Sequence, residues 1–266
     1  MKPFKLIPLF AICLITLTHS TLSHSVFAEQ QAEDAWQKLV RSPRLNKRPA
    51  FQFVENNSQL PNVFLYGDSI SIAYTDATRD ALKGKANVYR LYCNGGDSSS
   101  FIKKMQTMHD AMRDKDLKGH WDFDWDVIHF NVGLHDLKYV KGRKLDRVNG
   151  KQAISLEDYE KNLRAMIAYL KELAPKAKLI FATTTPVPEG EAGRVAGDAA
   201  KYNAAALKVL KDHPEIGVND LYGFTKPHHK EWWTKPGNVH FNATGATAQG
   251  KESARVIKQE LKKRDS

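Results

Sequence analysis

The sequence contains very little cysteine, with only Cys13 and Cys93 among its 266 residues. Cys13 lies within an apolar leader described below. The mature chain therefore keeps one cysteine and cannot form an intrachain disulfide, even in an oxidising compartment. Cys93 ends an apolar run, a position typical of a core residue. Stability must then come from a packed core, and the chain is long enough to build one.

The sequence also lacks metal ligands at the usual spacing. His228 and His229 are adjacent, and no third ligand follows at the spacing of a metal site. No recognised nucleic-acid-binding motif is present, although Lys and Arg outnumber Asp and Glu by 40 to 30. We therefore expect no metal or other cofactor and no nucleic-acid partner. The basic excess suits acidic polysaccharides, envelope surfaces or anionic lipid, or else an ordinary solvated surface.

The N-terminus has the three parts of a Sec-type signal peptide. Lys2 and Lys5 precede a mostly apolar run from Leu6 to Leu17, and Val26-Phe27-Ala28 has the spacing of a cleavage site. We predict cleavage after Ala28, with an uncleaved anchor as the alternative. No later run is apolar enough to span a membrane. The mature protein is therefore expected to be secreted or periplasmic, without a stable membrane anchor.

After Pro61 the sequence alternates between short apolar runs and longer amphipathic stretches. This alternation predicts one α/β domain over residues 61–266, a three-layer α/β/α sandwich with a five-stranded parallel sheet. Residues 29–60 are expected to form a lead-in that packs on this domain. The expected strands are residues 62–66, 87–92, 126–131, 178–183 and 216–219, and the expected helices are residues 70–83, 98–116, 156–173, 198–212 and 243–262.

Two long connections, residues 137–155 and 184–197, each follow an expected strand. Both should therefore lie over the carboxyl edge of the sheet. Ligands bind at that edge in open parallel α/β sheets, and long loops are often functional. We expect the site to lie there.

A serine at a strand-to-helix turn is the first candidate for chemistry. The apolar run before Tyr66 leads into Gly67-Asp68-Ser69 and then into an expected helix. Free N–H groups at a helix N-terminus can stabilise an oxyanion beside such a serine. A helix cap has the same local pattern, so Ser69 needs a base to count as a nucleophile. His240, just before the last helix, is the best-placed general base because it returns to the same edge.

Two further turns are expected at this edge. Asn94-Gly95-Gly96 follows the second strand, and its glycines allow backbone N–H groups to approach a ligand closely. Asn131, His135 and Asp136 follow the third strand, where polar side chains can donate to an oxyanion or orient other groups.

Taken together, the four segments resemble the sequence blocks of the SGNH hydrolases, also called GDSL-type esterases and lipases. The blocks occur in the family's order and cover nearly all of residues 61–245. The resemblance implies the flavodoxin-like SGNH hydrolase fold and a serine carboxylic ester hydrolase. By the same resemblance, Ser69 is the nucleophile and His240 its base. The N–H groups of Ser69 and of Gly96 (or Gly95) are then two oxyanion donors.

The sequence departs from the family at two polar positions. His135 stands where the family has an asparagine that donates to the oxyanion, and Asn131 is a rival donor. Neutral histidine can donate one N–H, so His135 is able to fill the role. Gly237 stands where the family has an aspartate, three residues before His240.

The missing aspartate predicts a Ser69–His240 dyad in place of a triad. Asn238, a backbone carbonyl or a distant acid would then orient the His240 ring. Asp220 follows the last expected strand and is the candidate acid, although such a residue is often only a cap.

The resemblance implies a small-acyl esterase, and we predict an exported acetylesterase that acts on carbohydrate. Trp232 and Trp233 precede the histidine loop and are expected to form a sugar platform, or else to be packing residues. A lipase or lysophospholipase-type acylhydrolase is one alternative, although the insertions contain no long amphipathic lid. The other alternative is a non-catalytic glycan-binding protein on the same fold, which would use Glu189, Arg194 and Lys138.

Overall fold

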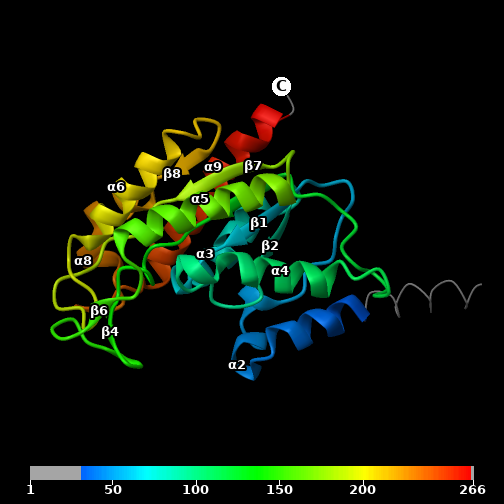
Figure 1. Ribbon diagram of the computed structural model, residues 1–266. Helices are drawn as coiled ribbons and strands as arrows, with labels where there is room; N and C mark the ends of the chain where they lie inside the picture. The colour runs from blue at the N-terminus through cyan, green and yellow to red at the C-terminus, as the bar shows by residue number, and fades with distance from the viewer. Residues whose placement is uncertain (1–30, 265–266) are drawn as a thin grey trace, which may run out of the picture.

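The computed structural model describes residues 31–264, so the predicted signal peptide, residues 1–28, lies outside the described residues. A five-stranded sheet with the order β2-β1-β3-β7-β8 forms the centre (Figure 1). All of its neighbouring strands are parallel. The order matches the flavodoxin-like arrangement and confirms the predicted fold class. The strands are β1 (Asn62–Tyr66), β2 (Asn87–Arg90), β3 (Val127–Phe130), β7 (Lys178–Ala182) and β8 (Gly217–Asn219).

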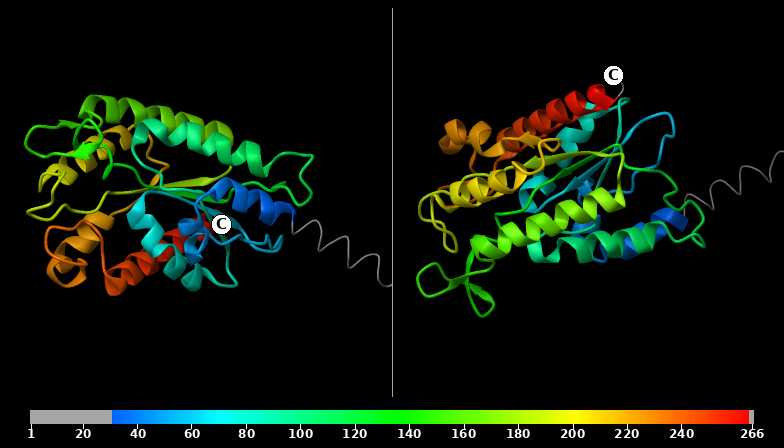
Figure 2. Two further views of the ribbon diagram at one scale, coloured as in Figure 1. Left: turned by 90° about the horizontal axis from the view of Figure 1, so that it is seen from below. Right: turned by 45° about the horizontal axis from the view of Figure 1, so that its top comes forward.

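Helices cover both faces of this sheet (Figure 2). Helices α3 (Ser69–Leu82) and α9 (Ala243–Arg264) pack together on one face. The other face carries α4 (Phe101–Met112), α5 (Leu156–Leu173) and α6 (Asp198–Leu210). The three predicted layers are therefore present, and the sheet edge between them is the place to look for the site.

Strand β1 shows why the central strands are apolar throughout. Val63 and Leu65 join an apolar cluster with Ile257 of α9, whereas Phe64 and Tyr66 join the cluster on the opposite face. All five residues of β1 are buried. A parallel strand covered on both faces requires such a continuous apolar run, because neither face meets water.

The lead-in packs against the same core. Residues 31–40 are helical and are followed by α2 (Pro43–Asn46) and the 3₁₀ turn η1 (Pro49–Phe51). Trp36 donates from Nε1 to the Phe51 carbonyl at 2.7 Å, and its ring centre lies 6.0 Å from that of Trp121. These contacts bring the segment before the sheet into the main apolar cluster.

The connection after β3, residues 137–155, has secondary structure of its own. It forms a small antiparallel sheet from β4 (Tyr139–Lys141), β5 (Lys144–Leu145) and β6 (Lys151–Gln152). We call this segment the basic insertion. Tyr139 N–H donates to the Gly193 carbonyl at 2.7 Å, which fastens the basic insertion to the second long connection.

The helix predicted over residues 98–116 is shorter than expected. Ser98–Ser100 form the 3₁₀ turn η2, and α4 ends at Met112. The chain turns there because Trp121 N–H donates to the Met112 carbonyl at 2.6 Å.

None of the described helices is long and apolar enough to cross a bilayer. Three short elements precede α9, namely α7 (Leu221–Thr225), η3 (Lys226–His228) and α8 (His229–Trp232).

Candidate active site

Ser69 is the first residue of α3, directly after the β1 turn. The helix cap is Asp68, whose Oδ1 accepts the Ile70 N–H at 2.9 Å. Ser69 is therefore not needed as the cap, and its hydroxyl is available for other contacts. Gly67 makes the tight turn, since a Cβ there would lie 2.8 Å from Ser71 Cβ and Oγ.

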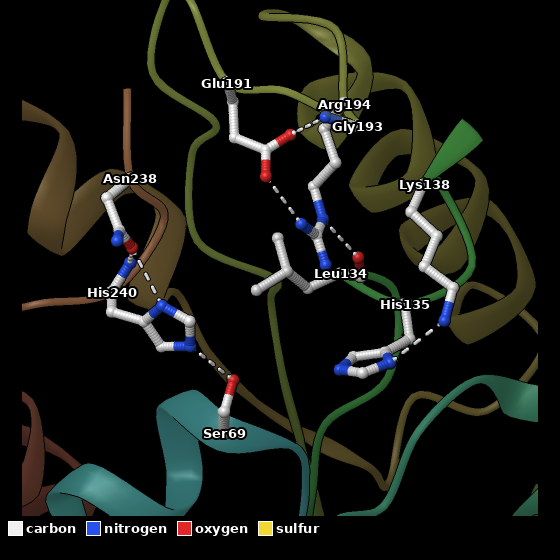
Figure 3. Close-up of polar contacts among 9 residues, drawn as sticks. All are labelled: Ser69, Leu134, His135, Lys138, Glu191, Gly193, Arg194, Asn238 and His240. Atoms are coloured by element: carbon white, nitrogen blue, oxygen red, sulfur yellow. Dashed lines mark hydrogen bonds and ion pairs between the residues drawn. The ribbon is translucent and has the colours of Figure 1, made fainter. Parts of the chain in front are cut away.

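His240 lies beside Ser69, as the sequence predicts. Its Nε2 is 2.9 Å from Ser69 Oγ, and its Nδ1 is 2.8 Å from Asn238 Oδ1 (Figure 3). Asn238 Oδ1 also accepts the His240 backbone N–H at 2.9 Å. Because that oxygen only accepts, Nδ1 carries the ring proton and Nε2 is left to accept from Ser69. Partial desolvation lowers the pKa of His240 below its ordinary value, so the ring is neutral at neutral pH.

Asp220 is not the acid of this pair. Its Oδ1 accepts from Gly223 N–H at 3.0 Å and from Thr183 Oγ1 at 3.0 Å. It caps α7, which makes the capping alternative correct. Among the hydrogen bonds of the described residues, the partner of His240 Nδ1 is the amide of Asn238 rather than a carboxylate.

The glycine turn after β2 packs closely against the turn that precedes Ser69. Gly95 N–H donates to the Gly67 carbonyl at 3.0 Å, and a Cβ on Gly95 would lie 2.8 Å from that oxygen. Gly96 has a φ of 70°, in the left-handed region. Its N–H donates to Asn94 Oδ1 at 2.9 Å. The predicted backbone donor is therefore bonded within its own turn in this structure.

Asn131 ties two strands together at the edge of the sheet. Its Nδ2 donates to the Ala182 carbonyl at 2.7 Å, and its backbone N–H donates to the Tyr66 carbonyl at 3.0 Å. The residue is buried. These bonds tie Asn131 to the neighbouring strands of the sheet. It is therefore a weaker candidate than His135 for the side chain that donates to the oxyanion.

His135 presents one ring nitrogen toward the nucleophile. Lys138 Nζ lies 3.4 Å from its Nδ1, and the Nε2 edge of the ring is turned toward Ser69 and His240 (Figure 3). An ammonium group can only donate, so Nδ1 accepts and Nε2 carries the proton. The pKa of His135 is lowered, mainly by burial; the nearby charge of Asp68 raises it, and the charges of Lys138 and Arg194 lower it. The ring is thus a neutral donor aimed at the site.

Asp136 joins the two turns that flank the serine. Its Oδ1 accepts the Ser98 N–H at 2.9 Å, and the side chain is fully buried. Burial raises the pKa of Asp136 to about 6. The residue fixes the β3 turn against the β2 turn, so it supports the site without facing it.

Arg194 and Glu191, from the second long connection, form a buried ion pair above the serine. Arg194 Nη1 lies 3.0 Å from Glu191 Oε1, and Arg194 Nε donates to the Leu134 carbonyl at 2.7 Å. Their side chains are only 8% and 9% exposed. The sequence suggested Arg194 only for a non-catalytic glycan site and did not suggest Glu191. Neither residue lies in a family block, so spacing gave no signal that they reach the serine.

The two tryptophans have different surroundings. Trp232 stacks on His228 at 4.1 Å and packs near Phe224 at 5.7 Å, so it is a packing residue rather than a platform. Trp233 stacks on His229 at 4.2 Å and lines a pocket of about 500 Å³. The pocket also includes Gly237, which directly precedes Asn238 in the chain. Within residues 31–264, no three His, Cys, Asp or Glu side chains gather as a metal site would require.

Comparison with known proteins agrees with this geometry. Residues 65–248 match the model of the GDSL-like lipase/acylhydrolase family, which is more than half of the chain. The chain therefore belongs to this family. It is an SGNH-type hydrolase that acts on esters. No curated protein shows a significant sequence match to it.

Solved structures share the fold at low sequence identity. One is the lipase/acylhydrolase from Enterococcus faecalis, with a TM-score of 0.56 and 17% identity over 75% of this chain and 96% of that one. Another is Axe2, an acetylxylan esterase from Geobacillus stearothermophilus, with a TM-score of 0.54 and 15% identity. That match covers 76% of this chain and 94% of Axe2. Identity this low supports the fold and leaves the substrate to be argued from the site.

Proposed function

We propose that this protein is an exported serine esterase that removes small acyl groups, acetyl above all, from carbohydrate. Ser69 is the nucleophile and His240 the general base. Asn238 orients the His240 ring. The observation that carries the proposal is the chain of contacts from Asn238 Oδ1 through His240 to Ser69 Oγ, at 2.8 and 2.9 Å.

The proposed reaction has two acyl-transfer steps. His240 Nε2 takes the Ser69 proton as Oγ attacks the ester carbonyl, and then gives that proton to the departing alcohol. Water, deprotonated by the same nitrogen, attacks the acyl-enzyme and releases the acid and Ser69. The chain's own residues supply each proton transfer, and no step calls for a cofactor.

The oxyanion is held by the Ser69 N–H and the His135 Nε2 proton. Ser69 N–H has no hydrogen-bond partner among the described residues, and it lies at the start of α3, where the helix dipole favours negative charge. Gly96 N–H becomes a third donor when the oxyanion takes the place of Asn94 Oδ1, its partner in the structure at 2.9 Å. An anionic acceptor makes the stronger hydrogen bond, which favours this exchange.

The pocket that is lined by Trp233 and Gly237 supports a carbohydrate substrate. It is lined by Trp233, with Val187 and Pro188 from the facing connection and Lys230 and Lys235 among its polar residues. An aromatic ring with polar neighbours suits a sugar, which has one apolar face and several hydroxyl groups. Export is supported by the signal-like pattern of residues 1–28.

The test is hydrolysis of p-nitrophenyl acetate by the purified protein and by Ser69→Ala. Loss of the serine should lower turnover by about 10⁴-fold or more. Acetate release from a panel of acetylated polysaccharides then identifies the sugar. Equal rates for the two proteins on p-nitrophenyl acetate would rule out the proposed nucleophile.

A further inference from the structure

Arg194 is a buried cation with one free end. Nε donates to the Leu134 carbonyl at 2.7 Å and Nη1 contacts Glu191 at 3.0 Å. Nη2 has no hydrogen-bond partner among the described residues, and it is not one of the enclosed nitrogens that lack a partner. In Figure 3 the guanidinium lies above the gap between His240 and His135, and its third nitrogen points to the side of the view on which Ser69 and His135 lie.

Glu191 holds the guanidinium in this position. Its Oε2 accepts the Gly193 N–H at 2.7 Å while Oε1 pairs with Arg194. An arginine buried this far and fixed at two of its nitrogens loses little further freedom when a ligand binds the third. The arrangement is therefore preorganised for an acceptor that comes from outside the protein.

Positive charge lies both at the site and in the segment beside it. Arg194 pairs with Glu191, and Lys138 contacts His135, which also lies near the carboxylates of Asp68 and Asp97. The basic insertion is fastened beside Arg194 by the bond from Tyr139 to Gly193. Residues 138–151 contain six Lys or Arg against the single Asp146. Such a surface attracts a polyanion toward the site and repels a cationic one.

We propose that the ester substrate carries an anionic group, a carboxylate or a sulfate, on its alcohol part and that Arg194 Nη2 binds this group. This rests on the proposed esterase function and narrows its substrate class to acidic carbohydrate. A guanidinium suits oxyanions of this kind because its planar group, held here at Nε and Nη1, presents the N–H groups of Nη2 at a fixed position. Arg194 is thus a specificity-determining residue, and Glu191 is the residue that positions it.

The experiment compares matched acetylated sugars that differ only in charge. One pair is an O-acetyl methyl glucuronoside and its C6 carboxamide. The other pair is O-acetyl galactose 6-sulfate and O-acetyl galactose. For the wild-type protein, kcat/KM should be roughly tenfold or more higher for the anionic member of at least one pair, as expected for a hydrogen bond to a charged group. The pair that shows the preference identifies carboxylate or sulfate as the group bound.

Arg194→Gln should abolish this preference for the anionic sugar. Arg194→Lys should keep part of it, because lysine retains the positive charge but not the planar group that fixes the donor. Arg255→Gln is the matched control. Arg255 also pairs with a glutamate three residues before it, Glu252 at 2.6 Å, but on the exposed face of α9. The control should keep the wild-type ratio.

Arg194→Gln also removes contacts within the loop. A second measurement therefore uses the wild-type protein and does not depend on how the variant folds. Free glucuronate or galactose 6-sulfate should inhibit competitively, and the neutral sugars should inhibit at least roughly tenfold more weakly. A wild-type ratio near one in both pairs, or a ratio that survives Arg194→Gln, would overturn the proposal. Serine-dependent hydrolysis of p-nitrophenyl acetate in the same preparation shows that such a failure concerns the substrate class and not the esterase function.

Discussion

The two sides of Ser69 differ in how their polar groups are used. On one side, His240 and Asn238 form a short line of hydrogen bonds that ends on the serine hydroxyl. On the other side, Gly96 N–H and the Asn131 amide are bonded to the protein's own oxygens. His135 presents a side-chain donor there. In the proposed mechanism, the proton-transfer side is complete without substrate, whereas the oxyanion side reaches its full set of donors only when substrate displaces an internal bond.

Charge separates the two sides as well. The proton-transfer side is oriented by a neutral amide where the family resemblance implies a carboxylate. The oxyanion side has both signs of charge close to His135: Lys138 and Arg194 lower the pKa of that ring, and Asp68 and Asp97 raise it. The site therefore lacks a carboxylate behind its base and has charged groups of both signs near its donor. The following predictions test this contrast.

The largest effect is expected on the proton-transfer side. His240→Ala should lower kcat/KM for p-nitrophenyl acetate by about 10⁴-fold or more, because the serine loses the group that takes its proton. Ser69→Ala combined with His240→Ala should be no slower than either single variant, since the two residues act as a unit. Steady-state kinetics on the three variants measures this. Additive losses would show that the two residues work independently.

A smaller loss is expected on the oxyanion side. His135→Ala should lower kcat by about 10²–10³-fold, with KM changed much less, because the donor acts on charge that develops in the transition state. His135→Asn, which restores a side-chain N–H donor, should recover most of that loss. Activity unchanged in His135→Ala would mean that the backbone N–H groups hold the oxyanion alone.

A modest gain is expected when the missing charge is restored behind the base. Asn238→Asp should raise kcat/KM roughly fivefold, because a hydrogen bond to a carboxylate is worth about 1 kcal/mol more than one to an amide. The Asn238 side-chain nitrogen has no hydrogen-bond partner among the described residues, so the substitution breaks no bond that the structure records.

The pH profile checks the cause of that gain. Desolvation holds the pKa of His240 below 6.5, and the ring must be neutral to act as a base. Activity should therefore be flat at neutral pH and fall only as the pH drops through this lowered value. A carboxylate at residue 238 favours the charged ring and raises its pKa, so the acid limb should move to higher pH. An unmoved limb would contradict direct contact between the two side chains.

The smallest effects concern the tryptophans. Trp233→Ala should raise KM for an acetylated oligosaccharide several-fold and leave kcat for p-nitrophenyl acetate nearly unchanged, since only the larger substrate fills the pocket. Trp232→Ala should instead lower the free energy of unfolding, by about 1–3 kcal/mol, because this ring packs between Phe224 and His228. Thermal denaturation and kinetics on both variants separate the two roles. A KM change in Trp232→Ala with unchanged stability would reverse the assignment.

Sequence patterns were sufficient for the fold and for the contact between Ser69 and His240. The five strands were predicted within a few residues, because most are short, mainly apolar runs buried on both faces; the edge strand β8, where Val218 is exposed, is the exception. Ser69 and His240 could be brought together because Ser69 follows the end of β1 and His240 precedes the last helix, where the chain returns to the same edge. The alternative for Ser69, a helix cap, is excluded by Asp68, which fills that role one residue earlier.

The sequence could not predict which hydrogen-bond partner each polar side chain has. Asn131 is equally polar whether it faces a ligand or, as here, the Ala182 carbonyl. Asp220 could be an acid or a cap, and only the position of Gly223 N–H decides. Arg194 lies far from every family block in sequence. The long loop that carries it folds back and brings it near His135 and His240. Such outcomes depend on tertiary contacts that no local pattern encodes.

The backbone of Gly237 limits how this active site can change under mutation. Its φ is 68°, and a Cβ there would lie 3.1 Å from the Gly190 carbonyl oxygen. One substitution, Gly237→Asp, or one other, Asn238→Asp, would supply an aspartate near His240. The first step would return the acid to its family position but force an L-residue into a left-handed, crowded backbone. The second substitution, at residue 238, leaves the backbone unchanged and places a carboxylate next to the His240 ring. Of two equally short mutational routes to a full triad, the fold leaves one open.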